Sequence, residues 1–156
     1  SLSIMKGYYQ NPDLNDTIFD RDGWFNTGDL GFLDKENQLH IRGRKKNVIV
    51  LDSGKNVYPE ELEGYYLQSE LIQEVAIFGK RINGKEVVYA VIFPKDEKTT
   101  YADIKAEVKR MNVGLPTYKT IGQFAVSKQL LPRTTTQKIV IREVIKNLEA
   151  GQYITA

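Results

Sequence analysis

The sequence predicts an α+β fold, because strand-like apolar runs are interspersed with amphipathic helical stripes and no βαβ repeat is evident. The apolar runs 75–78 and 87–93 flank Asn83-Gly84, the dipeptide preferred in two-residue type I′ hairpin turns. A third apolar run, 124–126, follows a helical stripe and predicts a third strand. We therefore expect an antiparallel three-stranded sheet with packed helices, preceded by an N-terminal β-hairpin region.

The segments before this sheet have shorter signals. Residues 1–22 are polar and rich in turn residues, with no periodicity that defines an element. Residues 32–33 and 38–41 flank the turn sequence 34–37 and predict a short hairpin. The compact apolar run 47–51 predicts one further strand.

Three helices are expected. Pro59 suits the first position of a helix, and the two glutamates after it suit its first turn. Thr100 and Asp103 form a capping pair at the start of a second helix. The apolar stripes of the three helices are Leu62, Tyr65 and Tyr66; then Ile104, Val108 and Met111; and finally Ile141, Ile145 and Leu148.

Composition describes an ordinary globular protein with one core. With 22 basic and 20 acidic residues, the net charge of +2 is too small to indicate nucleic acid or an anionic membrane as partner. The absence of cysteine excludes disulfides and thiolate chemistry in this chain. No apolar run approaches the roughly 18 residues of a membrane span, so we expect no transmembrane segment. A cytoplasmic location is expected, with peripheral membrane contact left open.

Several local patterns have ordinary explanations. The basic run 42–46 is typical of a solvated hairpin end, although it also resembles a nuclear-import or nucleic-acid patch. Gly54-Lys55 lacks the glycine spacing and the following Ser or Thr of a phosphate-binding P-loop. His40 is the only histidine, and we expect it to be structural or on the surface.

Three segments carry the functional signal. They are Gly-Trp-Phe-Asn-Thr-Gly-Asp-Leu-Gly at 23–31, the run 43–63 that begins Gly-Arg-Lys-Lys and ends Pro-Glu-Glu-Leu-Glu, and Pro-Arg-Thr-Thr-Thr-Gln-Lys-Ile at 132–139. In this order they resemble the last conserved motifs of the adenylate-forming enzymes, which include acyl-CoA synthetases, luciferases and peptide-synthetase adenylation domains. The resemblance covers nearly the whole chain.

The first two segments then imply a nucleotide site and a hinge. By the resemblance, Asp29 binds the ribose hydroxyls of ATP or AMP, a task that suits a carboxylate flanked by glycines. Arg44 matches the second nucleotide contact of the family, where a planar guanidinium reaches ribose and phosphate oxygens. Lys46 matches the hinge at which the small domain rotates between adenylating and thioester-forming arrangements.

The later segments imply the thioester and catalytic contacts. Ser53, Gly54 and Lys55 resemble the loop that approaches the pantetheine arm of CoA. Lys138 resembles the lysine that bridges the substrate carboxylate and the α-phosphate, stabilising charge in the transition state. Gln137 departs from the glycine usual before that lysine.

Together these features predict the C-terminal part of an acyl-CoA synthetase similar to bacterial long-chain fatty acid CoA ligases. Residues 1–43 would end the large AMP-binding domain and residues 44–156 would form the mobile C-terminal domain. The enzyme would use ATP, CoA, a fatty acid and Mg²⁺, whose ligands are expected in the large domain, so the chain alone is predicted to be inactive. Two alternatives stay open: an adenylation domain that serves a carrier protein, and a non-catalytic binding module of the same fold.

Overall fold

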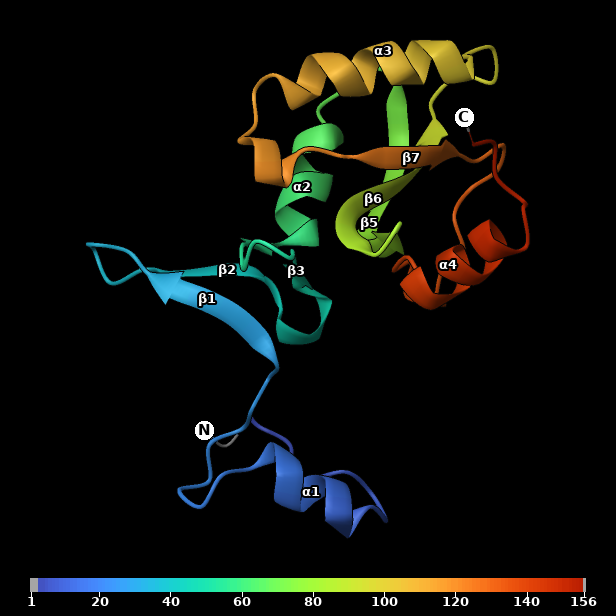
Figure 1. Ribbon diagram of the computed structural model, residues 1–156. Coiled ribbons are helices and arrows are strands. Elements are labelled where there is room, and N and C mark those ends of the chain that lie inside the picture. The colour runs from blue at the N-terminus through green and yellow to red at the C-terminus, as the bar shows by residue number, and fades with distance from the viewer. Residues whose placement is uncertain (1–2, 156) are drawn as a thin grey trace. The chain divides into compact units, whose positions relative to one another are not determined.

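The computed structural model describes residues 3–155, which divide into two compact units at the boundary between Lys46 and Asn47 (Figure 1). The mixture of helices and open sheets confirms the predicted α+β class.

The first unit contains one short helix and one hairpin. Helix α1 (Pro12–Ile18) begins after Asn11, whose side chain accepts a hydrogen bond from Leu14 N at 3.3 Å. Strands β1 (Asp29–Leu33) and β2 (Leu39–Arg44) pair antiparallel, as the turn signal between them predicts. Helix α1 was not predicted, because its seven residues are too few to show a periodic apolar stripe and none of them is buried.

Short elements join the hairpin to the second unit and begin that unit. A 3₁₀ helix, η1 (Lys45–Asn47), follows β2 directly. Strands β3 (Ile49–Val50) and β4 (Asn56–Val57) then form a small antiparallel pair. The strand predicted at 47–51 is therefore shorter, because the 3₁₀ turn takes Asn47 and the loop toward Gly54 begins at Leu51.

The sheet of the second unit is built on the predicted hairpin. Strands β5 (Ile72–Ile82) and β6 (Lys85–Pro94) pair antiparallel around Asn83 and Gly84, both of which have positive φ, as a type I′ turn requires. Strand β7 (Gln123–Val126) extends the sheet in the order β5-β6-β7.

The sheet is mixed and not wholly antiparallel, which corrects the prediction. Strand β7 runs parallel to β6. The connection between them contains helix α3 (Tyr101–Asn112) and the 3₁₀ helix η2 (Thr117–Lys119), and such a helical crossover returns the chain to the end of the sheet at which β6 began. The segment β6–α3–β7 is thus a βαβ unit that the sequence pattern did not reveal.

Helices cover both faces of this sheet (Figure 1). On one face, α2 (Pro59–Tyr66) and α3 pack through their predicted stripes, and Thr100 and Asp103 form the predicted capping box. On the other face, α4 (Ile141–Glu149) buries Leu148 as predicted, together with Val144, which the predicted stripe omitted.

Candidate functional site

Asp29 and Arg44, the two predicted nucleotide contacts, face each other on the hairpin of the first unit. They are direct partners in the register of β1 and β2, and Arg44 Nη1 lies 3.2 Å from Asp29 Oδ1. The side chains are 32% and 49% exposed, respectively, so a ligand can reach both. Strand pairing therefore brings together two residues that are far apart in the sequence, while their role in binding nucleotide stays a prediction.

The turn before β1 holds Asp29 in place through its own side chains. Asn26 Oδ1 accepts a hydrogen bond from Gly28 N at 3.0 Å, and Thr27 Oγ1 accepts one from Asp29 N at 3.1 Å. Gly28 has φ near +71°, a conformation that favours glycine, and its carbonyl accepts from Lys45 N at 2.8 Å. The motif residues around Asp29 are therefore turn-formers that fix the start of the strand.

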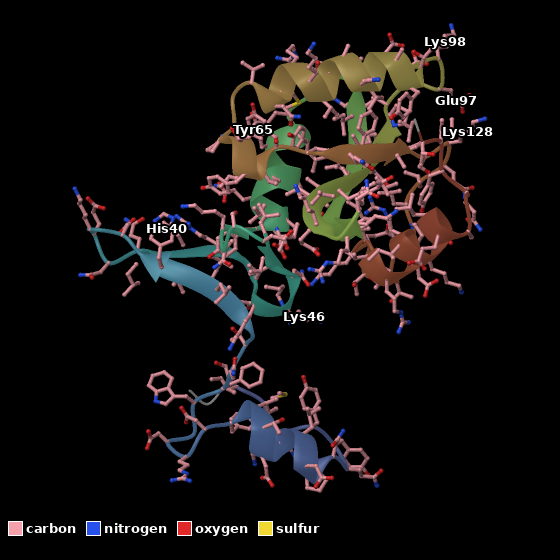
Figure 2. The ribbon with its side chains drawn as sticks, viewed as in Figure 1. His40, Lys46, Tyr65, Glu97, Lys98 and Lys128 are labelled. Atoms are coloured by element: carbon pink, nitrogen blue, oxygen red, sulfur yellow. The ribbon has the colours of Figure 1, made fainter. Side chains whose placement is uncertain are left out.

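Lys46 is the last residue of the first unit. It lies in η1, and its side chain is exposed (Figure 2). This position at the boundary between two compact units is where a hinge would act, although the assignment of Lys46 as a hinge stays a prediction.

The loop from Asp52 to Lys55 is the tip of the β3–β4 pair. It is closed by hydrogen bonds from Leu51 N to Lys55 O at 3.0 Å and from Gly54 N to Leu51 O at 2.8 Å. Gly54 has φ near +76°, and a Cβ placed on it would meet nothing within 4 Å. Glycine is therefore needed here for backbone conformation, and the open space around it leaves room for a ligand chain.

Lys138 ends a tight turn in the second unit, between β7 and α4. Thr134 N donates to Lys138 O at 2.9 Å, and Thr134 Oγ1 accepts from Lys138 N at 3.2 Å. Gln137 N donates to Thr134 O at 3.0 Å, and Gln137 has φ near +64°. The left-handed position explains why glycine suits residue 137, and the Lys138 side chain itself is exposed.

His40 takes no part in any of these arrangements. Its Nε2 lies 2.6 Å from Asp34 Oδ2, and its ring stacks on that of Phe32. Figure 2 shows His40 on the hairpin, away from Lys46. The hydrogen bond with His40 lowers the pKa of Asp34. Among residues 3–155, no group of three or more His, Cys, Asp or Glu side chains is arranged to hold a metal ion. In the same range, no helix is long and apolar enough to cross a membrane.

The family of the chain follows from a match to a family model. The model of the AMP-binding enzyme C-terminal domain matches residues 46–151, which is about two thirds of the chain. The chain therefore belongs to this family, the C-terminal domain of adenylate-forming enzymes, as the three motifs suggested.

Curated relatives extend the likeness over almost the whole chain. A long-chain-fatty-acid–CoA ligase from Bacillus subtilis is 31% identical over 153 residues, which cover 97% of this chain and 26% of the relative. A ligase of the same name from Escherichia coli is 35% identical over 142 residues, covering 90% of this chain and 24% of the relative. A sulfoacetate–CoA ligase from Cupriavidus necator is 33% identical over 139 residues, covering 88% and 26%. The chain thus spans about a quarter of the length of these relatives.

Solved structures agree with this assignment. The O-succinylbenzoate coenzyme A synthetase from Bacillus subtilis, in complex with AMP, has a TM-score of 0.75 and 28% identity, covering 90% of this chain and 28% of that one. The ATP-bound MatB from Rhodopseudomonas palustris has a TM-score of 0.72 and 30% identity, covering 92% and 28%. Both structures contain an adenine nucleotide.

Proposed function

We propose that the chain is the C-terminal part of an acyl-CoA synthetase that converts a fatty acid and ATP to acyl-AMP and pyrophosphate. The acyl group then passes to the thiol of CoA, and AMP is released. The observation that carries this proposal is the likeness to ligases named for long-chain fatty acids over 90–97% of the chain, a region that includes all three motifs.

In the adenylation step, the substrate carboxylate attacks the α-phosphate of ATP. The half-exposed carboxylate of Asp29 can accept hydrogen bonds from ribose hydroxyls, and the adjacent guanidinium of Arg44 can reach ribose and phosphate oxygens. The ammonium of Lys138 would stabilise the negative charge that builds between carboxylate and α-phosphate. These residues fit an adenine nucleotide in charge and exposure.

In the thioester-forming step, the thiol of CoA attacks the acyl carbonyl and AMP leaves. The open space around Gly54 fits the narrow pantetheine arm, with Ser53 and Lys55 beside it. Mg²⁺ would neutralise phosphate charge during adenylation. The described residues offer no cluster of ligands for it, so we assign its ligands to the large domain.

The first unit fits the role of the final part of a larger domain. Of its described residues only Gly43 is buried, so the unit has no apolar core of its own. Its large apolar side chains are instead exposed, including Trp24, Leu33, Leu39 and Ile41. Because such a concentration of exposed apolar residues is typical of interfaces, we propose that residues 1–43 pack on the preceding AMP-binding domain, while residues 44–156 form the mobile domain.

The full-length enzyme tests this function directly. We expect AMP release that depends on ATP, CoA and a long-chain fatty acid, measured over a series of acids of increasing chain length. The 156-residue chain assayed alone should release none, because the acyl site and most of the nucleotide site belong to the large domain. Transfer to a carrier protein but not to free CoA would favour an adenylation domain, and no adenylate with any acid would favour a binding module.

A further inference from the structure

Glu74 is a buried carboxylate at an irregular point of β5. The register between β5 and β6 shifts between Ile72 and Glu74, so Gln73 forms a bulge. After the bulge, Glu74 points to the same sheet face as Ala76 and Phe78, which is the face covered by α4. Only 5% of Glu74 is exposed, so its charge requires partners inside the protein.

Both partners of Glu74 come from the segment that leads into the Lys138 turn. Glu74 Oε2 accepts a hydrogen bond from Leu131 N at 2.8 Å, and Glu74 Oε1 accepts one from Arg133 Nη2 at 2.5 Å. A strand of the rigid sheet is therefore tied to this segment at two points. Charge-assisted hydrogen bonds of this kind are the stronger ones in proteins.

Arg133 continues the connection to the turn itself. Its other terminal nitrogen, Nη1, donates to the carbonyl oxygen of Gln137 at 2.6 Å. That carbonyl belongs to the peptide group that joins Gln137 to Lys138. Because a guanidinium is planar and has several donors, one arginine can hold Glu74 and the Gln137 carbonyl together, which a lysine cannot do with the same geometry.

We propose that Glu74 is a positioning residue for Lys138: it fixes the Arg133 guanidinium, which fixes the peptide group from which Lys138 projects. Neither Glu74 nor Arg133 contacts substrate in this role. The inference rests on the proposed function of Lys138 in adenylation. A reactive side chain whose backbone is held in this way needs less reorganisation to reach its substrate, and small displacements of such groups are costly for rate.

The test compares two conservative variants in the full-length enzyme. Glu74→Gln keeps the size of the side chain but removes its charge, and Arg133→Lys keeps a cation but loses the bridge. For each variant we expect kcat of adenylation to fall about tenfold, with a smaller change in the KM values for ATP and acid. Thioester formation from supplied acyl-adenylate should stay within about threefold of wild type.

A matched control separates positioning from general stability. Glu107→Gln removes the charge that pairs with Arg110, whose Nη2 lies 2.8 Å from Glu107 Oε1 in the same unit and outside the three motifs, and it should leave both half-reactions unchanged. Thermal unfolding is recorded for every variant. If Glu74→Gln does not fold, the test uses Arg133→Lys alone. This variant is expected to fold, because the lysine still provides a cation beside the buried carboxylate of Glu74.

The double variant with Lys138→Ala distinguishes failure of this inference from failure of the proposed function. Lys138→Ala alone should impair adenylation, and adding Glu74→Gln should cause no further loss, because the group being positioned is already gone. A wild-type rate for Lys138→Ala would overturn the proposed function. If Lys138→Ala impairs adenylation, three results would overturn the positioning role. In the first, Glu74→Gln lowers the adenylation rate of the Lys138→Ala enzyme by the same factor as that of the wild type. In the others, the single variants Glu74→Gln and Arg133→Lys leave adenylation unchanged, or they reduce both half-reactions equally.

Discussion

The ammonium of Lys138 is exposed, while the residues before it serve the geometry of the turn. Thr134 accepts the Lys138 N–H through its hydroxyl and closes the turn through its own backbone. This arrangement gives Lys138 a fixed backbone and a side chain that extends into solvent. An exposed lysine on a fixed backbone would suit the role proposed for Lys138, because its ammonium is accessible to a substrate bound outside its own unit.

Lys138→Ala in the full-length enzyme should reduce adenylation by about 10²-fold or more, as expected for the loss of one preorganised donor. The rate of thioester formation from supplied acyl-adenylate should remain within several-fold of the wild-type rate, because that step does not need charge stabilisation at the α-phosphate. Pyrophosphate exchange and thiolation, assayed separately, measure the two effects. Lys128→Ala, which removes another exposed lysine of the same unit, is the control. A wild-type adenylation rate for Lys138→Ala would contradict the assignment.

Gln137→Gly should stabilise the chain slightly, since Gln137 has φ near +64°. Glycine at position 137 removes the strain of a left-handed backbone conformation, and this gain exceeds the cost of the greater entropy of glycine in the unfolded chain. We expect the free energy of unfolding to rise by up to about 1 kcal/mol. Urea unfolding measures it. Gln129→Gly is the control, because Gln129 lacks a positive φ and glycine there should destabilise. Equal destabilisation by both variants would show that the turn gains nothing from glycine.

At the scale of elements, features that depend on neighbouring residues were predicted correctly more often than the pairing of strands that are far apart in the sequence. The Asn83-Gly84 turn and the Thr100 cap depend on residues within four positions of each other, so the sequence reveals them directly. The parallel pairing of β7 depends on the direction in which α3 returns the chain, and no short pattern encodes that direction.

In the candidate site too, local motifs were recognisable in the sequence and long-range contacts were not. The motifs indicated Asp29, Arg44, Gly54 and Lys138 as candidates, and a resemblance supplied their expected roles, which stay predictions. Glu74 was not found, because a single glutamate in an apolar strand gives no hint of its partner near residue 133. Its only sequence signal is a charged residue in a run that is otherwise typical of a buried strand.

Helix α2 contains a carboxyl group whose protonation should affect stability. Burial raises the pKa of Glu63 to about 7, and the charge of Glu60 adds to this, against the lowering effect of the hydrogen bond from Ile77 N at 2.9 Å. The folded state therefore binds a proton more tightly than the unfolded state, in which the pKa of Glu63 lies near the ordinary glutamate value of 4.5. The stabilisation is fully present below pH 4.5 and is lost as pH rises through about 7.

Glu63→Gln should remove this contribution to the pH dependence of stability. Relative to the variant, the wild-type chain should lose about 2 to 3 kcal/mol of unfolding free energy between about pH 5 and about pH 8. Urea unfolding at several pH values measures the difference. Glu70→Gln, whose side chain is 96% exposed, should follow the wild-type curve. Parallel curves for wild type and Glu63→Gln would mean that Glu63 ionises normally in the folded protein.

At the scale of the whole molecule, the two units differ in how they are stabilised. The second unit has apolar clusters on both faces of its sheet, whereas the described part of the first unit has only Gly43 buried. A unit with its own core can move as a rigid body, and a unit without one depends on the surface it covers. This difference on the two sides of Lys46 supports the proposed hinge, in which the second unit would be the part that moves.

Lys46→Ala in the full-length enzyme tests whether this boundary is a hinge. A long charged side chain at a hinge can exchange partners between the adenylating and the thioester-forming arrangements. Its loss should therefore destabilise one of these arrangements more than the other. We expect thioester formation to fall about tenfold and adenylation to change by no more than about threefold. Lys45→Ala removes the neighbouring lysine of the same 3₁₀ helix and keeps the backbone hydrogen bond to Gly28, so it should leave both steps intact. Equal losses in both steps for Lys46→Ala would indicate a simple structural contact, since a residue that only supports the fold has no reason to distinguish the two arrangements.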